Sequence, residues 1–91
     1  MTDRVARDLV IHGRVQGVFF RAFVRDAADR AGVAGVAENR PDGTVAVHLE
    51  GPPDSVAKVE RACGIGPQGA DVDRVDARDA TVEGRSGFSV S

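Results

Sequence analysis

The segment from Gly13 to Arg21, which reads Gly-Arg-Val-Gln-Gly-Val-Phe-Phe-Arg, has the residue types of an anion-binding loop. It joins a predicted strand to a predicted helix, so its backbone N–H groups and the positive end of the helix dipole can converge. Gly17 permits a close backbone approach or a positive φ. A cation in the first helical turn is disfavoured by the dipole, unless an anion lies between. The loop therefore predicts an oxyanion seat closed by Arg21, although a plain glycine turn beside a solvated arginine remains an alternative.

Asn39 is the second candidate for chemistry. It ends a predicted strand and precedes Arg40-Pro41-Asp42-Gly43, a turn in which proline and glycine set the backbone. Its carboxamide offers a donor and an acceptor in one plane, so it could hold a water molecule. Alternatively, the same group satisfies backbone atoms of the turn. The residues alone leave both interpretations open.

The other polar candidates are expected to be structural. His12 and His48 project from predicted strands, and we expect both to be solvated and without a carboxylate partner. Cys63 lies on the apolar side of a predicted helix, where a small buried hydrophobe is expected. No glycine-containing calcium loop frames the acidic residues near the C-terminus, so they predict a solvated strand face. These acidic residues are Asp71, Asp73, Asp76 and Asp79.

The elements that position these residues follow from hydrophobic periodicity. Apolar residues alternate strictly at Val45, Val47 and Leu49, and a helical stripe begins at Phe20. We expect the clustered Phe19, Phe20 and Phe23 to form core and pocket wall. Strands are predicted at 6–12, 35–39, 44–50 and 72–78, with a short edge strand at 88–90, and helices at 20–31 and 56–63.

This order predicts an α+β fold of the ferredoxin-like βαββαβ type. We expect an antiparallel sheet of four to five strands with two helices on one face. A single domain over residues 1–91 fits the length.

Composition limits the partners. The chain carries twelve basic and fourteen acidic residues, mixed along its length, and it has no Trp or Tyr. Nucleic acid is therefore not expected as a ligand. The sequence contains no run of 18 apolar residues, so no membrane-spanning helix is predicted. The lone Cys63 fits a reducing compartment. We expect a free-standing cytoplasmic monomer.

The two candidate segments together resemble the acylphosphatase family, and the resemblance covers nearly the whole chain. Residues 11–21 look like the family's first signature, and Gly35 to Asn39, Gly43-Thr44-Val45 and Gly51 look like its second. The later segment with Gly66-Pro67, Ala70, Val72 and Val75 is also similar.

The resemblance implies hydrolysis of the carboxyl–phosphate bond of an acyl phosphate, with inorganic phosphate as a product and no metal or organic cofactor. It implies that Arg21 binds the phosphate and that Asn39 positions the attacking water. The amides that would hold the phosphate belong to Val15, Gln16, Gly17, Val18, Phe19 and Phe20.

Two residues depart from the family pattern. Val36 replaces a usual aromatic residue and is expected to thin the core, whereas Glu38 should point away from Asn39 because adjacent strand residues alternate. The alternative hypothesis is a non-catalytic ferredoxin-like module that binds a small anion or a protein. A related possibility is a domain that acts beside an enzyme making carbamoyl-type acyl phosphates.

Overall fold

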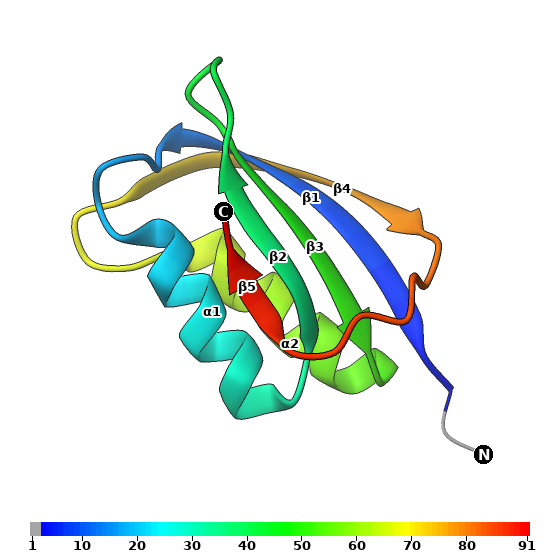
Figure 1. Ribbon diagram of the computed structural model, residues 1–91. Helices are drawn as coiled ribbons and strands as arrows, with labels where there is room; N and C mark the ends of the chain where they lie inside the picture. Colours follow the sequence, from blue (N-terminus) through cyan, green and yellow to red (C-terminus); the bar gives the residue numbers. More distant parts are fainter. Residues whose placement is uncertain (1–2) are drawn as a thin grey trace.

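The computed structural model describes residues 3–91 and contains the predicted elements in the predicted order (Figure 1). The boundaries agree within two residues, except that α2 begins at Pro53, three residues before the predicted start. Proline fits the first turn of a helix, because the N–H group it lacks would have no partner there. The elements are β1 (Val5–Arg14), α1 (Phe20–Ala31), β2 (Ala34–Asn39), β3 (Val45–Gly51), α2 (Pro53–Ile65), β4 (Asp71–Ala80) and β5 (Phe88–Val90).

The five strands form one sheet in the order β4-β1-β3-β2-β5. The four longer strands pair antiparallel as predicted, but β5 pairs parallel with β2, so the sheet is mixed. The reason is the connection at residues 81–87, which crosses from the β4 edge of the sheet to the β2 edge (Figure 1). We call residues 81–87 the crossing segment.

Both helices cover the same face of the sheet, and the core lies between them (Figure 1). The alternation of β3 places Val45, Val47 and Leu49 in this core. Among residues 3–91, no helix is long and apolar enough to cross a membrane. The same core cluster also contains Leu9, Ile11, Phe20, Val24, Ala28, Val56, Val59 and Cys63.

Two expectations about single residues are settled by the fold. Cys63 is buried as predicted, and burial raises the pKa of its thiol to about 12, so the thiol stays neutral at ordinary pH. The expectation that Val36 thins the core is wrong. Ala37 lies in the core, whereas Val36 is half-buried and lines a groove on the helix-free face with Glu38. The residue type at position 36 therefore affects the groove on the helix-free face of the sheet and not the core.

Candidate functional site

A pocket of about 350 Å³ lies where the start of α1 meets the end of β2 and β5. Arg21 and Asn39, the two candidates from different segments, both line it. Glu38 lines the groove on the other face of the sheet, as the alternation predicts. The pocket is lined by Val15, Gly17, Phe19, Phe20, Arg21, Ala22, Arg25, Asn39 and Val90.

The loop that enters α1 leaves backbone donors free at this pocket. Gly17 has φ 75°, and Phe19 occupies the N-cap position with φ 62° and ψ 29°. No side chain caps α1, and its first turn holds no acidic residue. The N–H of Phe23 donates to the carbonyl of Phe19 at 3.0 Å, so the preceding N–H groups of the helix have no intrahelical partner. Such a helix start favours a negatively charged ligand.

Gln16 ties this loop to the β2–β3 hairpin. Its Nε2 donates to the carbonyl oxygens of Arg40 at 2.8 Å and Thr44 at 2.9 Å. Neither Gln16 nor Val18 lines the pocket, although both belong to the predicted phosphate-binding loop. The side chain of Gln16 therefore fixes the distance between the loop and the hairpin that carries Asn39.

The hydrogen bonds of the hairpin turn bear on the role of Asn39. Asp42 accepts from the hydroxyl of Thr44 at 2.6 Å and from its N–H at 3.0 Å, and these bonds lower the pKa of Asp42. Within residues 3–91, the side chains that bond to the turn are those of Gln16, Asp42 and Thr44, and none of these bonds involves the carboxamide of Asn39. Asn39 is exposed and remains free to contact a ligand in the pocket.

Arg21 is held at the pocket by Ser91, the residue that follows β5. Its Nη1 donates to the carbonyl oxygen of Ser91, and the N–H of Ser91 donates to Ala37 at 2.9 Å. The guanidinium has further N–H groups, so this bond leaves donors for a ligand. Arg25 lines the same pocket one turn later. Arg25 was not predicted to belong to a site, although its i+4 spacing from Arg21 places the two side chains on the same face of α1.

The phenylalanine cluster divides between core and solvent. Phe20 is buried, and Phe23 packs edge-to-face on it with ring centroids 6.1 Å apart. Phe19 is 84% exposed and contributes to the pocket, not to the core. Its left-handed conformation turns the ring away from the position that a helical residue would take, which periodicity alone does not reveal.

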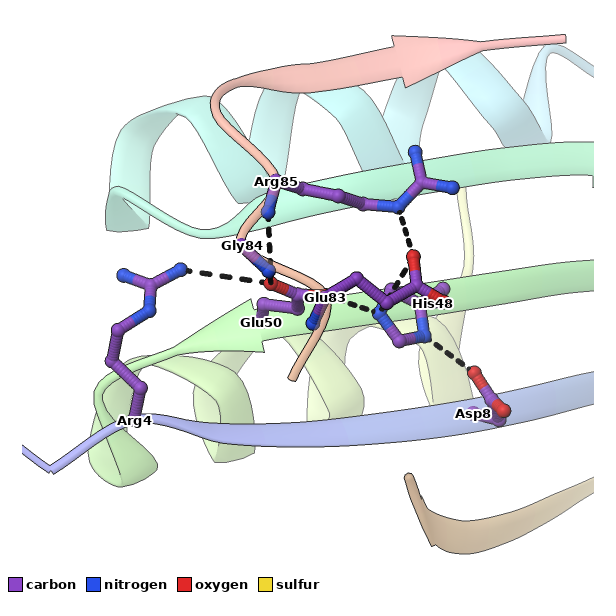
Figure 2. A network of polar contacts seen from close by, with 7 residues as sticks. All are labelled: Arg4, Asp8, His48, Glu50, Glu83, Gly84 and Arg85. Atoms are coloured by element: carbon purple, nitrogen blue, oxygen red, sulfur yellow. Dashed lines mark hydrogen bonds and ion pairs between the residues drawn. The ribbon is translucent and has the colours of Figure 1, made fainter. Parts of the chain in front are cut away.

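The expectation that His48 is solvated and unpartnered is wrong. The side chain is largely buried on the helix-free face of the sheet, where Nδ1 lies 2.6 Å from Asp8 and Nε2 lies 2.7 Å from Glu50 (Figure 2). Burial would lower the pKa of His48, but the hydrogen bonds to Glu50 and Asp8 raise it above its ordinary value. His48 is therefore part of a polar network that the sequence analysis missed.

Glu50 is the centre of this network and is fully buried. Its carboxylate accepts backbone N–H groups from Glu83 at 2.7 Å and from Gly84 and Arg85 at 3.1 Å (Figure 2). Burial would raise the pKa of Glu50, but the hydrogen bonds from His48 and the crossing segment outweigh it and lower the pKa to about 2. An ionised Glu50 thus anchors the crossing segment, which leads to β5 and the pocket.

His12 also has a carboxylate partner, contrary to expectation, because its Nε2 lies 2.9 Å from Asp76. The acidic residues of β4 are exposed as predicted, although Asp79 pairs with Arg7 at 2.8 Å. His48, Glu50 and Glu83 bring ligand-type atoms within 4.8 Å of one another. Glu50 is already bonded by His48 and three backbone N–H groups, so this cluster is accounted for as an anchor.

Comparisons with known proteins agree on one family. The family model described as Acylphosphatase matches residues 7–90. An acylphosphatase from a Nocardioides species is 52% identical over 96% of this chain and 88% of the relative. The crystal structure of acylphosphatase from Bacillus subtilis is similar with a TM-score of 0.93 and 33% identity, over 96% of this chain and 98% of that one. The structure of an acylphosphatase from Coxiella burnetii has a TM-score of 0.94 and 31% identity, over 98% and 94%.

Proposed function

The chain belongs to the acylphosphatase family and hydrolyses acyl phosphates, and from this premise we propose that the pocket beside the start of α1 is its active site. The observation that carries the proposal is that Arg21 and Asn39, which come from separate segments, line one pocket beside unpartnered N–H groups of a helix start. This combination suits a dianionic phosphate group.

The phosphate group would be held by backbone N–H groups of the loop and by the guanidinium of Arg21. We assign the amides to residues 15–20, of which Val15, Gly17, Phe19 and Phe20 line the pocket directly. Gly17 supports this assignment because its backbone has φ 75°, a conformation that residues with a side chain rarely adopt. Charge-assisted hydrogen bonds from fixed donors stabilise the transition state of phosphoryl transfer, because charge spreads over the phosphate oxygens.

Asn39 would position the attacking water. The water oxygen forms a bond to phosphorus while the bond from phosphorus to the carboxyl oxygen breaks. The acyl group leaves as a carboxylate, and the proton from the water ends on the phosphate. A carboxylate is a good leaving group, so positioning and charge stabilisation suffice without a protein nucleophile.

The setting of the reaction is also part of the proposal. We propose that residues 1–91 act as one domain, as a cytoplasmic monomer, on a small-molecule acyl phosphate and not on nucleic acid. The net charge of −2, the mixed distribution of charges and the buried lone Cys63 support these statements.

Turnover of benzoyl phosphate in excess chelator, combined with phosphate binding, tests the proposed site. Wild-type protein is expected to release benzoate and phosphate. The Asn39→Ala variant is expected to lose turnover by about 100-fold, a size typical of a lost positioning or transition-state contact, while its affinity for inorganic phosphate stays near that of wild type. If phosphate affinity and turnover fell together, the water-positioning role of Asn39 would be wrong.

A further inference from the structure

Phe19 combines two features that packing does not explain. It is the one residue other than glycine with a positive φ in the described part of the chain, and its side chain is 84% exposed. A bulky side chain in the left-handed region is strained, and such strain tends to persist at functional sites. Because so little of the ring is buried, the core does not require it.

The pocket beside Phe19 has a polar part and an apolar part. Gly17, Arg21 and Arg25 supply the backbone and cationic part, and Phe19, Ala22 and Val90 supply an apolar wall. A water molecule takes about 30 Å³ of liquid, so four phosphate oxygens fill on the order of 120 Å³. The pocket of about 350 Å³ therefore has room beside the phosphate.

The chemistry of the substrate indicates that the acyl group occupies the rest of the pocket. An acyl phosphate joins its acyl group to phosphorus through one bridging oxygen, so the acyl group lies next to the seated phosphate. The backbone N–H of Phe19 belongs to the phosphate seat, and its ring therefore lies within one side-chain length of the acyl group. Val90 is fixed in the same pocket by the pairing of β5 with Ala37 of β2.

We propose that Phe19 and Val90 form the subsite for the acyl group and that this subsite favours aromatic acyl groups over acetyl. This inference rests on the proposed function. An aromatic acyl group stacks on an exposed ring and removes apolar surface from water, whereas the single methyl group of acetyl removes little. The expected preference is about tenfold in kcat/KM.

The test compares benzoyl phosphate with acetyl phosphate in wild type, Phe19→Ala and Phe19→Tyr. The readout is the ratio of the two kcat/KM values, because a general change in the loop affects both substrates alike. Phe19→Ala is expected to lower the benzoyl-to-acetyl ratio about tenfold, and Phe19→Tyr, which keeps a ring, is expected to retain it. Ile65→Ala removes another exposed apolar side chain, one outside the pocket, and is expected to leave the ratio unchanged.

The outcomes separate the two proposals. A ratio that stays at the wild-type value in Phe19→Ala would overturn the acyl subsite while turnover itself upheld the active site. A ratio that Ile65→Ala lowers equally would also overturn it, because the effect would then not belong to the pocket. If wild type hydrolysed neither substrate, the proposed function would fall and the subsite with it.

Discussion

His48 and Glu50, two residues apart on β3, are joined by a hydrogen bond of 2.7 Å between Nε2 and the carboxylate. The other ring nitrogen of His48 lies 2.6 Å from Asp8. Ionised carboxylates only accept hydrogen bonds, so both contacts are hydrogen bonds only when the imidazole carries two protons. The network in Figure 2 therefore requires a protonated His48, which agrees with its raised pKa.

Stability is expected to fall at alkaline pH because of His48. Since its folded-state pKa is raised above 6.5, its contribution is fully present below pH 6.5 and is lost as pH rises through the folded value. Besides Asp8 and Glu50, the carboxylate of Glu83 faces the ring at 3.8 Å, and Arg85 bonds that carboxylate at 2.7 Å. Urea unfolding between pH 5.5 and 9 should show this loss in wild type and not in His48→Gln.

His12→Gln is the matched control for this titration, because His12 faces one carboxylate instead of two. It should keep the alkaline loss. If His48→Gln retained the wild-type slope above pH 6.5, the doubly protonated network would be wrong.

Glu50→Gln is expected to reduce the free energy of unfolding by about 2–4 kcal/mol at neutral pH. The amide cannot accept as many N–H groups, so buried donors of the crossing segment are left without partners. The pKa of Glu50 is lowered from 4.5 to about 2, so its stabilisation is present above pH 4.5 and is lost as pH falls toward 2. Urea titrations at several pH values measure both effects.

Glu38→Gln changes an exposed carboxylate on the neighbouring strand and should cost little stability. An equal loss in both variants would show that charge on this face matters, and not the anchor at Glu50.

Arg21→Lys is expected to lower kcat/KM for benzoyl phosphate by about 100-fold with little change in melting temperature. An ammonium group cannot reproduce the planar fork of a guanidinium on phosphate oxygens. Arg30→Lys, an exposed change on the same helix, is the control and should keep full activity. Full activity in Arg21→Lys would remove Arg21 from the site.

The fold was predictable because its periodicities are local. The alternation of Val45, Val47 and Leu49 identifies β3, and the same alternation puts His48 and Glu50 on the opposite face. His48 was nevertheless expected to be solvated, because no carboxylate partner could be identified from its spacing in the sequence. The crossing segment that covers Glu50 has no periodicity of its own, and its path depends on the long-range pairing of β5 with β2.

The candidate site was predictable where the residue type itself limits the chemistry. Gly17, Arg21 and Asn39 were identified from the types of donor they offer, and the fold brings them to one pocket. The exposure of Phe19 could not be predicted from the sequence, because it depends on a backbone conformation that glycine usually adopts. The sequence pattern assigned Phe19, Phe20 and Phe23 together to core and pocket wall, and it did not show which of them lies outside the core.

Gln16→Met is expected to impair the site without removing any group from the pocket. The two hydrogen bonds from Nε2 to Arg40 and Thr44 hold the loop against the hairpin, and Met fills the same length without donating. Losing two net hydrogen bonds should lower the free energy of unfolding by about 1–3 kcal/mol. Phosphate affinity and turnover should both fall by about tenfold, because misplacing the loop relative to Asn39 affects binding and attack alike. Gln68→Met, an exposed change of the same type, should alter neither quantity, and unchanged kinetics in Gln16→Met would show that the loop keeps its position without this contact.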